Sequence, residues 1–297
     1  METDLVPGVD LDAGALLGLK HLAGRRGAPG SRRLIARPGG VVTRRRGRGS
    51  EIDDVRPWTD GDDIRHIDRH ATARTGEPHV RTFRDERERA ALLVADFRPA
   101  MLFGTRRAFR SIAGAEALAI LGWRAVQEGG RVGALCLTSG DPVYVRPKGG
   151  ERAMTAVAGA MAAAHARALA ESDRDDPPLD AALETAAAAL PRGGRLALAT
   201  GLDTPGPRFD DVIRAALDRV AVTVALIADA FEADPPRGAL AFLTREGRRG
   251  WLAPRANRAA DPRVERLRAL SVPVVTLDAG WAPERAAPEL EALDAAR

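Results

Sequence analysis

The most regular feature of the chain is an alternation of short apolar runs with longer amphipathic segments, which begins near residue 91. The apolar runs are typical of strands buried on both faces, and they cover residues 91–95, 131–138, 195–200, 221–228 and 272–277. Helical spacing of apolar residues fills the intervals, at 108–128, 150–170, 179–190, 209–218, 261–270 and 283–296. A hairpin is expected at 239–244 and 247–252. This order predicts an α/β domain over residues 91–297, a doubly wound, mostly parallel sheet in three layers.

The first ninety residues differ from this pattern in composition and in the spacing of apolar residues. Residues 1–30 predict an N-terminal helix, near 13–23, followed by a basic linker. Residues 31–90 hold turn-forming residues between short β-like runs at 33–36, 41–44 and 79–83. We expect this region to be a charged β/loop subdomain that packs on the main domain, because it has little apolar content of its own.

Acidic residues stand at or just after the ends of several predicted strands. Asp96 ends the first strand, and Asp203 and Asp229 follow two later ones. Ligands of open α/β sheets bind outside the carboxyl ends of the strands. The sequence therefore predicts a functional site at that edge.

The net charge of +4 is unevenly distributed. No acidic residue lies between Asp12 and Glu51, whereas ten basic residues do, and we call residues 20–48 the basic arm. Such an arm suits nucleic acid, an anionic membrane surface or an acidic protein. It has no interleaved aromatic residues for base stacking, which weakens a single-strand role.

Familiar catalytic and nucleotide-binding motifs are absent. The chain has no glycine-rich dinucleotide motif after the first strand, no P-loop and no nucleophile elbow around a serine. Its single cysteine and five histidines show no metal-ligand spacing with a neighbouring acid. The N-terminus does not resemble a signal peptide, and no apolar run is long enough to span a membrane, so a cytoplasmic protein is expected.

The densest group of charged residues lies at 51–74, where acids and arginines alternate. An arginine guanidinium group can bind a carboxylate with two hydrogen bonds, which favours a structural salt-bridge network in this segment. The alternative is a hydrolase site built on Asp62, Asp63, Asp68 and His66.

This segment carries a family resemblance. The central residues of its motif are Arg56, Gly61, Asp62, Asp63, Arg65 and Asp68. The motif continues at Ala71–Arg74, at Glu86 and in the run around Asp229. Over residues 30–280 the chain resembles the bacterial family called domain of unknown function 58. One departure is Arg69, where the family usually has tryptophan.

The resemblance implies a fold similar to von Willebrand factor A domains and a partnership with MoxR-type AAA+ ATPases in assembly, maturation or stress-related chaperone systems. It also implies that residues 56, 61, 62, 63, 65, 68, 74 and 86 are structural or bind a partner.

Integrin-like members of that wider fold hold Mg²⁺ through an acid and two hydroxyls after the first strand. Here Asp96 is followed by Phe97, Arg98 and Pro99, and Pro177-Pro178 precede the helix where a threonine would stand. We expect a degenerate metal site without a cofactor, in which Arg98 pairs with Asp96 or Asp203 in place of the cation.

Three functions remain open from the sequence. The first is a non-enzymatic adaptor that binds a MoxR-type ATPase, and possibly a client protein, through the strand ends around Asp96, Arg98 and Asp203 and the charged residues 51–89. In this hypothesis the basic arm meets an acidic surface of the ATPase. The second is a nucleic-acid-binding protein that uses the basic arm. The third is an unrecognised hydrolase, which requires a carboxylate with a raised pKa.

Overall fold

The computed structural model describes residues 5–24, 52–59, 62, 64–83, 90–171, 175–243, 247–253 and 261–295. The chain forms two compact units, one made of residues 1–26 and 89–297 and the other of residues 27–88. The helical start of the chain thus belongs to the α/β unit. The basic arm lies outside the described residues except for residues 20–24.

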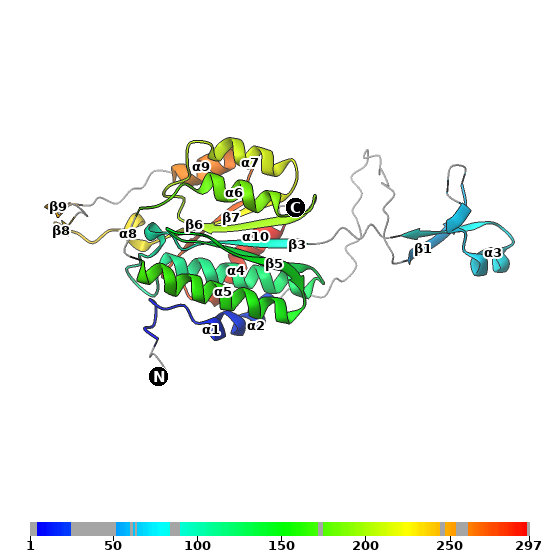
Figure 1. Cartoon of the computed structure of the whole chain (residues 1–297), viewed down its shortest axis with the longest axis horizontal. Helices are drawn as coiled ribbons and strands as arrows, with labels where there is room; N and C mark the ends of the chain where they lie inside the picture. Colours follow the sequence, from blue (N-terminus) through cyan, green and yellow to red (C-terminus); the bar gives the residue numbers. More distant parts are fainter. Residues whose placement is uncertain are drawn as a thin grey trace. The chain divides into compact units, whose positions relative to one another are not determined.

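A six-stranded sheet forms the centre of the α/β unit, in the order β10-β7-β6-β3-β4-β5 (Figure 1). Five strands are parallel. They are β3 (Ala90–Asp96), β4 (Arg131–Leu137), β6 (Arg195–Thr200), β7 (Ala221–Ala228) and β10 (Val274–Asp278). The sixth, β5 (Val143–Gly149), is an antiparallel edge strand beside β4 that the hydrophobic pattern did not predict.

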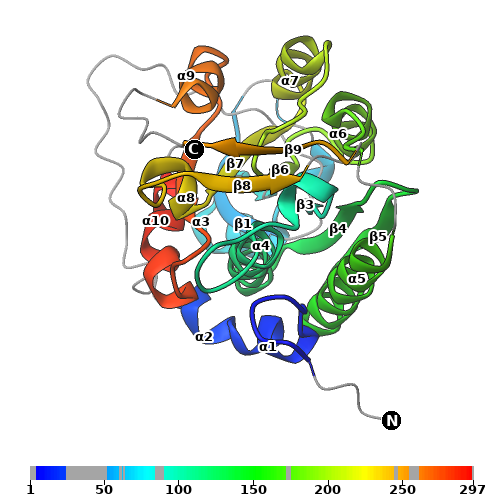
Figure 2. The same cartoon turned by 90° about the vertical axis from the view of Figure 1, so that its left-hand side faces the viewer.

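Helices cover both faces of the sheet, as Figures 1 and 2 show. One layer holds α6 (Leu179–Ala188), α7 (Phe209–Leu217) and α9 (Pro262–Ala269). The other holds α1 (Ala13–Gly18), α2 (Lys20–Ala23), α4 (Arg110–Gln127), α5 (Glu151–Ala170) and α10 (Pro283–Ala295). The predicted three-layer, doubly wound α/β fold is confirmed.

Alternation along the central strand explains the two layers. In β3, Leu93 and Ala95 belong to the core under α4 and α5, whereas Leu92 and Val94 belong to the core under α6 and α7. Successive strand side chains point to opposite faces. A strand with apolar residues at every position is therefore stable only between two helical layers.

Two insertions accompany the carboxyl ends of the strands. A short 3₁₀ turn, η2 (Pro99–Met101), follows β3. After β7, the short helix α8 (Ala230–Ala233) leads to the predicted hairpin, which consists of β8 (Leu240–Leu243) and β9 (Arg249–Leu252).

The second unit contains a two-stranded antiparallel sheet of β1 (Ile52–Pro57) and β2 (His79–Phe83), with η1 (Ile64–His66) and α3 (Arg69–Thr75) between them. Strand β2 matches the prediction, but β1 was missed. Residues 69–75 are a helix, where the sequence suggested an irregular segment, because the Asp68 carboxylate accepts the amide hydrogens of His70 and Ala71 and starts it. The strands predicted at 33–36 and 41–44 lie outside the described residues.

Across the described ranges, the chain contains no helix that is both long enough and apolar enough to cross a membrane.

Candidate functional site

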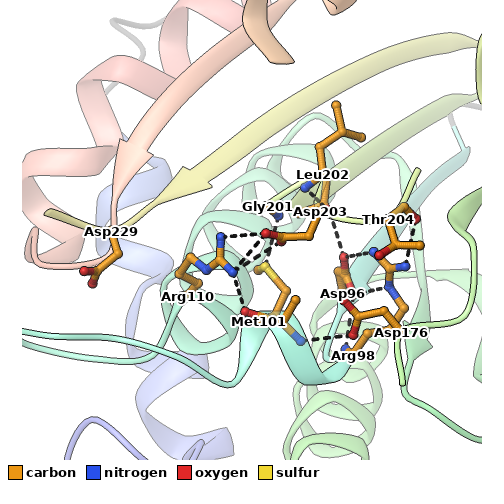
Figure 3. A network of polar contacts seen from close by, with 12 residues as sticks. Asp96, Arg98, Met101, Arg110, Asp176, Gly201, Leu202, Asp203, Thr204 and Asp229 are labelled. Atoms are coloured by element: carbon orange, nitrogen blue, oxygen red, sulfur yellow. Dashed lines mark hydrogen bonds and ion pairs between the residues drawn. The ribbon is translucent and has the colours of Figure 1, made fainter. Parts of the chain in front are cut away.

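Charged side chains from several elements meet at the carboxyl edge of the sheet (Figure 3). Asp96 ends β3, Thr200 ends β6, and Asp229 follows β7. Arg110 begins α4 at the same edge. We call this edge, defined by Asp96, Arg98, Arg110, Asp203, Glu232, Asp261 and Arg263, the strand-end face.

Arg98 and Asp96 form a buried ion pair in the middle of this face. The side chains of Arg98 and Asp96 are 2% and 0% exposed. Arg98 donates from Nε to Oδ1 and from a terminal nitrogen to Oδ2 of Asp96, each at 2.8 Å. The sequence left two partners open for Arg98, and its contact is with Asp96.

Further hydrogen bonds complete the shell of the Asp96 carboxylate. The Arg98 backbone amide donates to Oδ1 at 3.1 Å, and the Thr200 hydroxyl donates to Oδ2 at 2.6 Å. With the two guanidinium bonds, Asp96 accepts four hydrogen bonds. That number matches the roughly four lone-pair sites of a carboxylate.

The remaining donors of Arg98 bind the backbone of two neighbouring loops. Its Nη1 donates to the carbonyl oxygens of Pro177, which precedes α6, and of Thr204, which follows β6, the latter at 3.1 Å. Arg98 therefore joins three loops at the carboxyl edge. Leu202, in the loop after β6, has a φ of 56° and donates its amide hydrogen to Thr200 Oγ1. A non-glycine residue in that region costs free energy, which the surrounding contacts must offset.

The charges of this pair shape the local electrostatics. Burial alone would lower the pKa of Arg98, but the hydrogen bonds and charge of Asp96, together with the charges of Asp176 and Asp203, raise it above its usual value. Nearby Asp176 accepts a hydrogen bond from the Ala100 amide at 3.0 Å. Desolvation, with the charges of Asp96 and Asp203, raises the pKa of Asp176 more than the Ala100 hydrogen bond and the Arg98 charge lower it.

Arg110 is a second nearly buried arginine, with its side chain 7% exposed. It contacts Asp203 and Glu232, each at 3.3 Å, and donates to the Ala100 carbonyl oxygen. Asp203 therefore pairs with Arg110. Because the Asp203 side chain is 32% exposed, it presents part of this pair to solvent.

Arg263 extends the network to α9. It contacts Glu232 at 2.7 Å and Asp261 at 2.8 Å, and donates to the Gly201 carbonyl oxygen at 3.0 Å. The Asp261 hydrogen bonds raise the pKa of Arg263, and the Arg263 hydrogen bonds lower the pKa of Asp261. The Glu232–Arg263 pair joins the two ends of the insertion that carries β8 and β9.

Asp229 is held by hydrogen bonds. Its carboxylate accepts from the backbone amide and hydroxyl of Thr105 and from the Phe231 amide. Desolvation would raise the pKa of Asp229, but these hydrogen bonds lower it overall. Its side chain and that of Glu232 form a capping box that starts α8.

The family-motif residues lie in the second unit. Arg56 binds Asp62 with two hydrogen bonds of 2.7 Å, and Thr59 donates to Asp62 from its amide and its hydroxyl. The Arg56 and Thr59 contacts lower the pKa of Asp62, which is the opposite of what the hydrolase hypothesis requires. Asp68 starts α3, Arg65 and Arg74 are exposed, and Gly61, Asp63 and Glu86 lie outside the described residues.

The α/β unit also contains a buried Ser–His pair. Ser111 Oγ and His165 Nε2 are 2.9 Å apart, and both residues are 0% exposed. Burial lowers the pKa of His165 to about 4, and its Nδ1 has no hydrogen-bond partner among the described residues. A catalytic nucleophile–base pair needs access to substrate and a third group that orients the base, and neither is found for this pair among the described residues.

Sequence reasoning located Asp96, Arg98 and Asp203 but missed Arg110, Glu232 and Arg263. An acidic residue at the end of an apolar run can be recognised from sequence as a candidate site residue. Glu232 could have been found in the same way as Asp229, since both lie in a segment that carries the family resemblance. Arg110 and Arg263 occupy the first turns of two helices, and their shared contacts with Glu232 form only after folding. The described residues contain no group of three or more His, Cys, Asp and Glu that could hold a metal ion.

Comparisons with known proteins show distant relatives. The chain is 37% identical over 89 residues to Uncharacterized protein Mb1516 of Mycobacterium bovis and to Uncharacterized protein Rv1480 of Mycobacterium tuberculosis. The match covers 30% of this chain and only 28% of each of those proteins.

Two solved structures show weak overall similarity. Conserved hypothetical protein BatB from Bacteroides thetaiotaomicron aligns with a TM-score of 0.46 and 14% identity, over 69% of this chain and 98% of BatB. An aerotolerance-related membrane protein from Bacteroides fragilis, carrying multiple mutations to serines, aligns with a TM-score of 0.42 and 15% identity, over 68% and 98%. At these scores neither structure bears on the function of this chain.

The family comparison covers most of the molecule. The model of the family described as "Protein of unknown function DUF58" matches residues 54–263, which include the second unit's motif and all of the strand-end face. The chain therefore belongs to the DUF58 family.

Proposed function

We propose that this protein is a non-enzymatic adaptor whose strand-end face binds a MoxR-type AAA+ ATPase and, with it, a client protein. The choice of partner rests on the family resemblance. The choice of surface rests on the geometry of the carboxyl edge.

The observation that carries the proposal is the saturated carboxylate of Asp96. A general base or a nucleophile needs a free lone pair, and Mg²⁺ needs several oxygen ligands in near-octahedral positions. All four acceptor sites of Asp96 are used, and the Arg98 guanidinium lies against it. This donor set does not suit a divalent cation, so we assign the face to recognition and not to metal-dependent chemistry.

The outer part of the same face offers charges to a partner. Asp203 and Glu232 are each 32% exposed at the side chain, and Asp261 and Arg263 are 29% and 22% exposed. They are held by ion pairs on elements anchored in the sheet. Charges placed in this way direct association and select partners more than they add affinity.

The test measures binding of the purified full chain to the MoxR-type ATPase encoded nearest to its gene, without nucleotide, with ADP and with ATP. The Asp203→Asn variant should bind several-fold more weakly and with a shallower salt dependence, because a charge at the rim of an interface mainly affects the association rate.

The matched control is Glu151→Gln. Glu151 also pairs with a cation, Lys20, and lies at the start of α5, at the opposite edge of the sheet. It should bind like the wild type. No binding under any nucleotide condition removes the ATPase from the proposal, and equal losses in both variants remove the strand-end face.

A further inference from the structure

The β8–β9 hairpin exposes large apolar side chains. Phe242 is 45% exposed, Trp251 74% and Leu252 50%. The two strands contact chiefly each other. A two-stranded hairpin without further packing is at best marginally stable in water, so these side chains are positioned to gain from a partner.

The exposed apolar residues lie on both faces of the hairpin. The register pairs Phe242 with Gly250 and Ala241 with Trp251. Residues paired across two strands share a face, and neighbours along a strand do not. Phe242 and Leu252 therefore lie on one face and Trp251 on the other.

The segment around the hairpin is strongly basic. Residues 236–260 include one acidic residue, Glu246, and six arginines at positions 237, 245, 248, 249, 255 and 258, which gives a net charge of +5. Arg237 and Arg249 are exposed. The described part of this segment therefore combines exposed aromatic side chains with exposed arginines.

We propose that the hairpin binds an anionic lipid surface, with Phe242, Trp251 and Leu252 at the interface and the exposed Arg237 and Arg249 against the headgroups. A flat protein surface covers one face of a hairpin, whereas a lipid interface surrounds both. Tryptophan prefers the interfacial zone, and arginines near an anionic leaflet add electrostatic attraction.

The depth of insertion has a physical limit. The outer edges of a two-stranded sheet carry unpaired backbone groups, which are costly to place in hydrocarbon. The hairpin therefore stays at the level of the headgroups. Because Glu232 and Arg263 close the base of the insertion, lipid binding holds the strand-end face near the surface through the same ion-pair network.

The test is sedimentation of the full chain with phosphatidylcholine vesicles, with and without phosphatidylglycerol, at low and high salt. The wild type should sediment with the anionic vesicles only and be released by salt. The double variant Phe242→Ser/Trp251→Ser should lose sedimentation. Its control is Tyr144→Ser, which removes a 46% exposed aromatic residue from β5 and should leave sedimentation unchanged.

The charges are tested separately. Arg237→Gln/Arg249→Gln should partition roughly 25-fold more weakly, at about fivefold per arginine. The control Arg192→Gln/Arg219→Gln removes two exposed arginines at the opposite edge and should bind like the wild type. Circular dichroism verifies that each variant is folded.

Three outcomes overturn the proposal. One is no sedimentation of the wild type with either vesicle, and another is equal sedimentation with neutral vesicles. The third is a Phe242→Ser/Trp251→Ser variant that sediments with anionic vesicles as well as the wild type does, which would show that the hairpin does not bind the lipid. The assay contains no ATPase, so its result is independent of the adaptor proposal.

Discussion

Arg98 and Asp96 are the most deeply buried residues of the strand-end face, and their ion pair is its central contact. Removing one partner of a buried pair leaves an uncompensated charge, which typically costs about 3–5 kcal/mol. We expect Arg98→Met to lower the free energy of unfolding by about 3 kcal/mol or more. Arg98→Lys should also destabilise, because lysine cannot donate to Asp96 with two nitrogens and reach both loop carbonyls.

Urea unfolding of the single variants and of Asp96→Asn/Arg98→Met checks this expectation. The double variant should recover part of the loss, since it leaves no unpaired charge. Additive losses would show that the two residues do not act as a pair.

His165 gives a prediction of pH dependence. Its folded pKa of about 4 lies below the roughly 6.5 of an exposed histidine, so the unfolded chain takes up the proton first as pH falls. The native state should therefore lose about 3 kcal/mol of stability between pH 6.5 and pH 4, and lose none of it above that window.

The comparison for His165 is the His165→Gln variant, measured by urea unfolding at several pH values. Glutamine does not titrate, so the slope of stability against pH should be shallower than in the wild type across this window. Equal slopes would contradict a buried neutral histidine.

The strands and helices were predictable to different extents. Buried parallel strands such as β3 and β6 were found because both faces demand apolar residues. Strand β5 was missed because it lies at the edge of the sheet and its residues alternate in burial. It also contains Pro147, and proline within a run of residues favours a loop over a strand.

The same contrast holds within the site. Asp96 was found because an acid ends an apolar run, and Arg98 because it replaces an expected hydroxyl. The Pro177 and Thr204 carbonyls that hold Arg98 were beyond prediction, because side-chain patterns do not encode where loop carbonyls point.

We expect the hairpin insertion to contribute little to the stability of the α/β unit. Its strands contact chiefly each other, and the Glu232–Arg263 pair holds its base. Replacing residues 236–258 with a Gly-Ser linker should change the free energy of unfolding by less than about 1 kcal/mol, since loop-closure entropy depends weakly on length. A larger loss in a thermal or urea melt would show that the hairpin packs on the unit.

At the scale of the whole molecule, the apolar core is concentrated in one of the two units. Both hydrophobic clusters consist of residues from the α/β unit. Among the residues of the second unit whose burial is described, Ala71 and Val80 are the buried apolar ones. The described part of this unit thus buries little apolar surface, and a small unit of this kind gains little from folding alone.

Deletion of the second unit tests this division. Gly24 lies beside the end of α4, near the edge of the sheet where β3 begins, so a short flexible linker can join the two segments of the α/β unit. A chain in which such a linker joins Arg26 to Arg89 should fold and unfold cooperatively. Isolated residues 27–88 should show no cooperative thermal transition by circular dichroism. Loss of cooperative unfolding in the deleted chain would show that the α/β unit depends on the second.

The guanidinium at the end of β3 also determines how this face can be switched. A bound metal ion can be withdrawn by a chelator or by a fall in its concentration, whereas a side chain of the same polypeptide cannot dissociate. The positive charge beside Asp96 is therefore present at every magnesium concentration. In the proposed adaptor, any control of partner binding must therefore act elsewhere than at this ion pair.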